Sequence, residues 1–328
     1  MKNFIWHLYR KRNKLPKIVC IEACSLCQLN CPDCHMRKND PNIIVGNGYL
    51  KFKDFKKFVD KHPYIESIEL SFCGEIFLNP ELLEIIKYAY KKKVKLTAFN
   101  GVNFNTVSEE ILEALAKYEF TGITFSIDGT TQETYQKYRK NGDINKVFEN
   151  IKKLNSYKEK YKSKYPILQW QYIVFEHNEH ELSNVKKIQN ELKIDNVYFK
   201  APWGKPDFSI EVRQKIKKLN LDKPKDIEIV KAVTENSPSI CLFPWLKPQI
   251  NWNGELLGCC CSTHHTLDIN VFDTNLKKAL NSEKCSYMKD VLTGKEESDS
   301  TLHCLHCPFY DKMRKNKQFI NPKLIKFI

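Results

Sequence analysis

The stretch Cys27-Gln-Leu-Asn-Cys31-Pro-Asp-Cys34 and the apolar run Ile18-Val-Cys-Ile-Glu-Ala23 before it decide how this chain folds. The run is typical of a short strand, and the three cysteines fall on the loop that follows it. A loop can bring three thiolates to three irons of one [4Fe–4S] cube, whereas a strand would point alternate side chains apart. Three protein ligands would leave the fourth iron open to a small ligand.

A second frame of cysteines has the same spacing. Cys20, Cys24 and Cys27 repeat it, but there the first ligand would be locked inside the strand. The frame that begins at Cys27 places the strand wholly before the loop and puts Pro32 where a turn is needed, so we favour it. A structural zinc site, which usually takes paired C-x2-C elements, and a disulfide framework are the alternatives.

Length and composition indicate a globular protein without a membrane span. The 328 residues allow one large or two ordinary domains, and 42% of them are hydrophobic. No apolar run reaches the roughly 18 residues of a membrane helix, and the amino terminus lacks the pattern of a secretory signal. Thirteen cysteines without an export signal predict a cytoplasmic protein that uses them for metal rather than disulfides.

The formal net charge of +14 is compatible with nucleic acid, an anionic metabolite or an acidic peptide as partner. Its lysines are scattered, and no basic run is interleaved with aromatic residues as in a nucleic-acid platform. We therefore do not expect nucleic acid to be the partner. A non-catalytic metal-cluster protein that binds nucleic acid stays as the alternative of another class.

Strands and helices alternate along the first two thirds of the chain, which predicts an α/β fold with parallel strands and crossover helices. The strands are expected at 18–23, 65–72, 94–99, 122–127, 167–175 and 197–200. The helices are expected at 52–62, 80–90, 108–117, 132–138, 144–162 and 180–192. Alternation alone does not separate an open sheet from a barrel.

The domain organisation follows from changes in composition. Residues 1–16 read as a basic extension, 17–201 as the α/β domain, 202–238 as a proline-containing linker and 239–328 as a cysteine-rich domain. Within the last domain, Asn253-Gly254 lies between two apolar runs and predicts a hairpin.

The cysteine loop does not stand alone. Glu22 lies five residues before Cys27, Cys73-Gly74-Glu75 follows the second expected strand, and Phe-Ser-Ile-Asp-Gly129 ends the fourth. As a set, these motifs resemble the radical S-adenosylmethionine (SAM) superfamily over roughly residues 17–201. The resemblance implies a partial (β/α)6 TIM-like barrel with its chemistry at the C-terminal ends of the strands.

The resemblance also implies which residues bind SAM at the open iron. Gly74 and Glu75 match the motif that receives the methionine amino group, although Cys73 replaces that motif's usual first glycine. The other positions that the family pattern implies are Ser126 and Asp128 for the ribose, Arg139 for the carboxylate, and Ile173 and Asn178 beside the adenine.

The last domain is similar to the SPASM and twitch domains that carry auxiliary clusters. No cysteine follows Cys307, so the shorter twitch type with a single four-cysteine [4Fe–4S] cluster fits better. The ligands it implies are Cys241, Cys259, Cys304 and Cys307. Structural zinc is the alternative for this set, and His303 and His306 beside the last two cysteines keep it open.

The function implied is reductive cleavage of SAM to a 5′-deoxyadenosyl radical that abstracts hydrogen from a carbon, with a flavodoxin- or ferredoxin-type electron donor. The enzyme is then an oxidoreductase or an epimerase, and for epimerisation Cys260, Cys261 or Cys73 is a candidate hydrogen donor. Few residues precede the first strand to hold a leader-binding domain. This favours a sugar- or cyclitol-like substrate, with maturation of a ribosomally made peptide as the alternative.

Overall fold

The computed structural model describes residues 15–34, 36, 43–202, 209–219, 241–259 and 262–321. It divides into two compact units, each assembled from separate segments. Unit 1 comprises residues 1–22, 41–68 and 226–328, and unit 2 comprises residues 23–40 and 69–225. The domains expected from the sequence were contiguous. The first expected strand and helix instead cluster with the C-terminal third of the chain.

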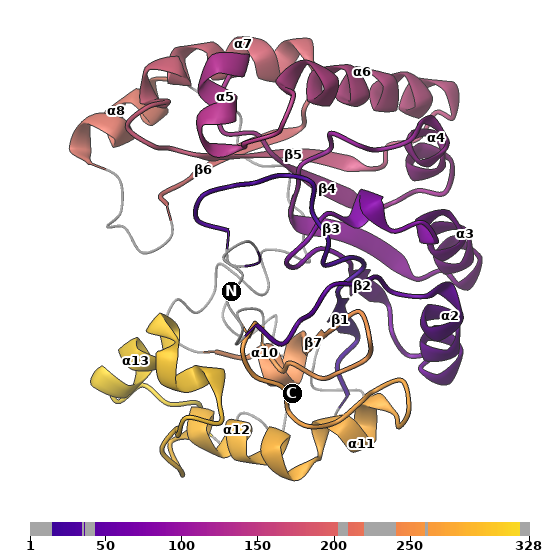
Figure 1. The fold of residues 1–328 in the computed structure, drawn as a ribbon, viewed down its shortest axis with the longest axis vertical. Helices are drawn as coiled ribbons and strands as arrows, with labels where there is room; N and C mark the ends of the chain where they lie inside the picture. Colours follow the sequence, from indigo (N-terminus) through magenta and orange to yellow (C-terminus); the bar gives the residue numbers. More distant parts are fainter. Residues whose placement is uncertain are drawn as a thin grey trace. The chain divides into compact units, whose positions relative to one another are not determined.

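Unit 2 contains a run of parallel strands. They are β3 (Lys95–Val102), β4 (Gly122–Ser126), β5 (Ile167–Ile173) and β6 (Asn196–Lys200). Each pairs in parallel with the next, so their C-terminal ends share one edge (Figure 1). The strand order does not close into a ring. The expected α/β fold class is confirmed as an open parallel sheet, consistent with a partial barrel.

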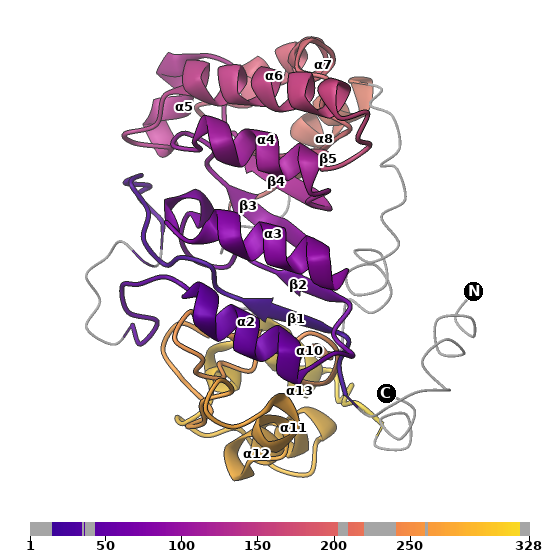
Figure 2. The same cartoon turned by 90° about the vertical axis from the view of Figure 1, so that its right-hand side faces the viewer.

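Helices connect these strands. They are α3 (Leu82–Lys92), α4 (Glu109–Lys117), α5 (Gln132–Tyr138), α6 (Ile144–Lys160), α7 (Leu182–Glu191) and, after β6, α8 (Ile210–Lys218). Figure 2 shows α3, α4 and α6 side by side along one face of the strands. The buried residues of that face include Phe125, Trp170 and Tyr172, which shield the strands from water on the helix side.

Local sequence explains where several helices begin. The Ser108 side chain accepts a hydrogen bond from Ile111 N and so caps α4. The Asp143 carboxylate caps α6 in the same way, accepting from Asn145 N and Lys146 N. Helix α3 begins two residues later than expected because the Asn79 side chain accepts from Glu81 N and holds a turn there.

The second expected strand is shorter in the structure. β2 spans Ser67–Glu69, and the buried Glu69 carboxylate then accepts bonds from Ser71 Oγ, Thr97 Oγ1 and Phe99 N. These bonds follow directly after β2, where the hydrophobic alternation alone predicted three more strand residues. β3 is longer than expected and continues past Gly101, whose φ of +111° suits glycine.

In unit 1, β1 (Ile18–Ile21) pairs in parallel with β7 (Gln249–Ile250), and the first helix is α2 (Phe52–Lys61). The expected hairpin is confirmed: Ile250 and Leu256 bridge in antiparallel fashion, and Gly254 has a φ of +94°. The remaining helical elements are α10 (Phe243–Leu246), α11 (Leu276–Leu280), α12 (Glu283–Thr293), the 3-10 helix η4 (His303–His306) and α13 (Pro308–Lys315). None of the helices that the structure describes combines the length and apolar character needed to span a bilayer.

Candidate functional site

The three cysteines of the loop lie near one another in unit 2. Burial is the main cause that raises the pKa of Cys27 to about 12, and the neighbouring charges of Cys31 and Cys34 raise it further. Burial likewise raises the pKa of Cys31, with Cys34 adding to the effect. Cys27 still has exposed surface, so atoms outside the protein can reach the loop. The other frame is less suited, because Cys20 and Cys24 are buried and Cys20 lies within β1.

This set of donors fits an iron–sulfur cube, because three thiols lie near one another on one loop. A single zinc ion would require its ligands about 2.3 Å from one point, whereas a cube presents a separate iron to each sulfur. Three thiolates held together repel one another, and bound iron would relieve that repulsion.

Two polar side chains donate to this group of thiols. Asn103 Nδ2 lies 3.6 Å from Cys27 Sγ, and Arg139 Nη1 lies 3.8 Å from Cys31 Sγ. Asn103 follows β3 and is also fixed by Gln28, whose Nε2 donates to Asn103 Oδ1 over 2.8 Å. Sequence reasoning missed Asn103. Its signal was a polar residue two positions after the Asn100-Gly101 pair.

Gly74 lies where two stretches of backbone come together. A Cβ atom at this position would overlap Cys24 O and crowd the backbone at Ser25 and Leu26. Only glycine therefore fits beside the start of the cysteine loop, and Glu75 N continues the contact by donating to Leu26 O over 2.8 Å. The predicted SAM motif is thus hydrogen-bonded to the cysteine loop through its backbone.

Glu75 is buried and holds the neighbouring loop. Its carboxylate accepts bonds from Asn103 N at 2.6 Å and Phe77 N at 3.4 Å. Burial raises the pKa of Glu75 to about 7, although these backbone N–H groups lower it. In this structure the carboxylate positions Asn103, and its direct contact with a SAM ammonium stays a prediction. Cys73, the third candidate hydrogen donor, is half-buried next to this motif.

Asp128 and Arg139 form a buried ion pair at the ends of β4 and α5. Arg139 Nε lies 2.6 Å from Asp128 Oδ2, and Ile173 N donates to Asp128 Oδ1 over 2.7 Å. Burial raises the pKa of Asp128, while Arg139 opposes that rise. Burial would lower the pKa of Arg139, but Asp128 and then Cys31 raise it, so the guanidinium stays charged.

The remaining predicted SAM contacts are largely enclosed. Ser126 is almost buried, and Asn178 is fully buried. Asn178 Nδ2 donates to Ile173 O, and its Oδ1 accepts from Phe175 N, so the side chain fixes the loop after β5. Ile173 is partly exposed and can face a ligand directly. Contacts of Asn103, Arg139 and Asp128 connect the ends of β3, β4 and β5 to the cysteine loop.

A second group of thiols lies in unit 1. Burial raises the pKa of Cys304 to about 12, with added effects from the nearby Cys241 and Cys307. Three of the four predicted auxiliary ligands are therefore neighbours, and the position of Cys259 relative to them stays a prediction. Cys260 and Cys261, the other candidate hydrogen donors, lie outside the described residues.

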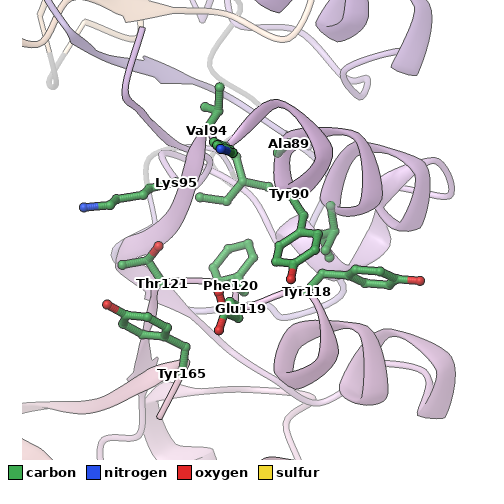
Figure 3. Close-up of a pocket in the computed structure, with 12 residues that line it drawn as sticks. Ala89, Tyr90, Val94, Lys95, Tyr118, Glu119, Phe120, Thr121 and Tyr165 are labelled. Atoms are coloured by element: carbon green, nitrogen blue, oxygen red, sulfur yellow. The ribbon is translucent and has the colours of Figure 1, made fainter. Parts of the chain in front are cut away.

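A cavity elsewhere in unit 2 is not part of this site. It has a volume of about 220 Å³ and lies between α3, α4 and the starts of β3 and β4, with Tyr90, Lys95, Tyr118, Thr121 and Tyr165 in its lining (Figure 3). Barrel enzymes place their chemistry at the opposite, C-terminal ends of the strands. The thiols and the Asp128–Arg139 pair are at those ends.

Comparison with known proteins identifies one matching family model. Residues 21–168 match the model of the radical SAM superfamily. A comparison with curated proteins found no match.

Two solved proteins illustrate the similarity of fold. Streptococcus suis SuiB bound to S-adenosylmethionine aligns with a TM-score of 0.64 and 14% identity, over 90% of this chain and 72% of SuiB. SuiB bound to its precursor peptide SuiA aligns with a TM-score of 0.63 and 13% identity, over 90% of this chain and 70% of SuiB. Native anSMEcpe with AdoMet and the Cp18Cys peptide aligns with a TM-score of 0.57 and 14% identity, over 94% of this chain and 98% of that protein. At these identities the likeness shows a shared fold.

Proposed function

We propose that this protein is a radical SAM enzyme that binds a [4Fe–4S] cluster through Cys27, Cys31 and Cys34 and SAM at the open iron. When bound, the reduced cluster supplies the electron that cleaves SAM, and the resulting 5′-deoxyadenosyl radical abstracts hydrogen from a substrate carbon. The observation that carries the proposal is the grouping of three neighbouring thiols with the Asp128–Arg139 pair at the C-terminal strand ends.

In this proposal the chain's own side chains orient SAM. Arg139 uses Nε for Asp128 and Nη1 for Cys31, so Nη2, which has no partner among the described residues, remains for the SAM carboxylate. Asp128 is too buried to reach solvent and would act by holding Arg139 and Ile173 N in place. Ser126 and Ile173 would border the ribose and adenine, and Gly74 would let backbone carbonyls approach the amino group.

Anaerobic reconstitution with iron and sulfide, followed by reduction with dithionite, tests the proposal. The wild-type protein should convert SAM to 5′-deoxyadenosine, measured by chromatography. Variants with alanine at any of the three loop cysteines should not, whereas Cys285→Ala, which changes a buried core thiol, should retain the activity. Absence of 5′-deoxyadenosine from a protein with its full iron content would leave a non-catalytic metal protein.

The auxiliary site is proposed to hold a second [4Fe–4S] cluster on Cys241, Cys259, Cys304 and Cys307. The neighbouring positions of three of these thiols support it. Iron analysis distinguishes a cluster from structural zinc: about eight irons per chain are expected if both sites hold cubes, and about four irons with one zinc otherwise.

A peptide is the substrate class that we now put first. SuiB was solved with its precursor peptide and anSMEcpe with a peptide, and a net charge of +14 would attract an acidic peptide. A sugar- or cyclitol-like molecule is the other class. Candidate substrates of both kinds can be compared by the extra 5′-deoxyadenosine that each elicits.

The fate of the substrate radical is open to isotope tracing. Solvent deuterium at an inverted centre would indicate epimerisation, with Cys73, Cys260 or Cys261 as hydrogen donor. Loss of two electrons without deuterium would indicate dehydrogenation. Reduced flavodoxin and ferredoxin can replace dithionite in the same assay to test the proposed type of electron donor.

A further inference from the structure

Strands β4, β5 and β6 carry polar side chains in register on one face. Thr124, Gln169 and Asn196 align across the strands, and so do Ser126, Gln171 and Tyr198. Thr124 Oγ1 donates to Gln169 Oε1, and Tyr198 OH donates to Gln171 Oε1, which places these pairs on the same side. A barrel interior is normally filled with branched apolar residues, so this polar face is suited to a ligand.

The opposite face has the usual apolar character. Phe125, Trp170 and Val197 align with one another in the intervening row, and all three are buried. Helices α4, α6 and α7 lie along that side of the strands (Figure 1). Thr124, Ser126, Gln171 and Asn196 on the polar face are buried as well, so the polarity of that face does not come from exposure to solvent.

Lys200 ends this polar face. It is the last residue of β6, aligned with Ile173 of β5 and two positions after Tyr198. Its ammonium lies 5.5 Å from the centre of the Tyr198 ring. Lys200 forms no ion pair within the described part of the chain. It has exposed surface, yet burial lowers the pKa of its ammonium, which fits a packed aliphatic stem with a reachable end.

The nearest acidic group does not neutralise this lysine. Asp128 raises the pKa of Lys200, but its carboxylate is paired with Arg139 at 2.6 Å and also accepts from Ile173 N. Asp128 is therefore committed to Arg139, and Lys200 keeps its charge available for a ligand. Where protein lowers the local dielectric constant, such a charge attracts an anion more strongly than it would in water.

We propose that Lys200 binds an anionic group of the substrate, a carboxylate or a phosphate, beside the hydrogen-bonding side chains of Tyr198 and Gln171. This inference rests on the proposed function, because it places the substrate at the same strand ends as SAM. It gives the substrate a chemical requirement that both candidate classes can meet, through a carboxylate of a peptide or a phosphate ester of a sugar.

Protection of the lysine from acetylation tests the inference without relying on turnover. The reconstituted holoenzyme is pulsed with succinimidyl acetate in the presence of inorganic phosphate, N-acetylglycine or SAM, and labelling is quantified by peptide mass spectrometry. At ten times its dissociation constant, a bound anion should slow labelling of Lys200 about tenfold. Lys193, which is exposed and pairs with Glu159, is the matched control and should not change.

The pattern of protection decides the outcome. Protection by N-acetylglycine indicates a carboxylate, and protection by phosphate indicates a phosphate group; either supports the inference. Protection by SAM alone would assign Lys200 to the cofactor and overturn it. Equal protection of Lys193, or no protection by any probe, would also overturn it.

Two variants separate binding from folding. Lys200→Met should abolish calorimetric binding of the protecting probe, and Lys200→Arg should retain it, with both variants melting like the wild type. If wild-type protein fails to make 5′-deoxyadenosine, the proposed function fails whatever the labelling shows. If it makes 5′-deoxyadenosine while Lys200 stays unprotected, only this inference fails.

Discussion

The cysteines of the Cys27–Cys34 loop and those around Cys304 are both groups of neighbouring thiols, but they belong to different compact units. Asn103 and Arg139 donate to Cys27 and Cys31 at 3.6 and 3.8 Å, and both belong to segments that also contact other predicted SAM residues. Around Cys304, the charges that affect the thiol are those of Cys241 and Cys307. Cys241 N also donates a hydrogen bond to Met313 Sδ over 3.4 Å.

This difference suggests a division of labour. A cluster beside Arg139 can accept a further polar ligand, because the guanidinium has donors that Asp128 and Cys31 do not use. In the proposed function the second group would hold an auxiliary cluster, which suits electron transfer or structural support. The predictions that follow test whether damage to one group of thiols leaves the other intact.

The largest effect is expected from ligand loss. Cys31→Ala should lower 5′-deoxyadenosine formation by more than about 100-fold, because changes merely next to metal ligands already cost 10- to 100-fold. Cys304→Ala should keep measurable SAM cleavage, since its thiol lies in the other group. Product assays with iron analysis of both variants check this. Equal loss of cleavage in the two would contradict the proposed division.

Breaking the buried ion pair should cost stability in unit 2. Arg139→Met leaves Asp128 buried without its counter-charge, and such a loss typically costs about 3–5 kcal/mol. Denaturation by urea measures the change. The double variant with Asp128→Asn should recover part of the loss, because the amide oxygen can still accept from Ile173 N. If the double variant were no more stable than the single, a buried charge would not be the cause.

The sequence predicted the fold and the loop well because both follow from local patterns. Alternating apolar runs located every strand from β1 to β6, and the cysteine spacing identified the thiols that the structure brings together. The sequence could not predict the length of β2. The Glu69 carboxylate at the end of that strand accepts hydrogen bonds from Thr97 and Phe99, which lie far along the chain.

Side chains that act through long-range contacts were the ones missed. Asn103 is 76 positions from Cys27, and nothing near either residue indicates the contact. The polar face that ends at Lys200 requires the registers of three strands, which spacing along one strand cannot supply. The compact units also depend on the pairing of β1 with β7, so contiguous domains were the natural expectation from the sequence.

Asn103→Ala should affect the first cluster and not the second. Removing the amide deletes the donor to Cys27 Sγ, and hydrogen bonds to cluster sulfur help to set the reduction potential, which should fall. Glu75 keeps its bond to the backbone N of residue 103, so the loop should hold. Potentiometric titration with electron paramagnetic resonance can follow both clusters. A change confined to the reduction potential of the second cluster would contradict the contact of Asn103 with the first.

The smallest effect concerns the pH dependence of stability in unit 1, the unit that carries the second group of thiols. His62 Nδ1 donates to Phe58 O over 2.7 Å, and Leu276 N donates to His62 Nε2 over 3.0 Å, so the buried ring must be neutral to make both bonds. Burial lowers the pKa of His62 below its ordinary value of 6.5.

Below pH 6.5 the unfolded chain therefore binds more protons at this residue than the folded one does. The contribution of His62 to the free energy of unfolding should be fully present above pH 6.5. It should fall as the pH drops towards the lower pKa of the folded state. Urea denaturation between pH 5 and 8 checks the slope, and His62→Phe should flatten it at some cost in stability. An unchanged slope in that variant would place the pH dependence on other groups. His177 is the first of these to test. Burial also lowers its pKa, and it lies in unit 2, so its titration would place the acid sensitivity in that unit.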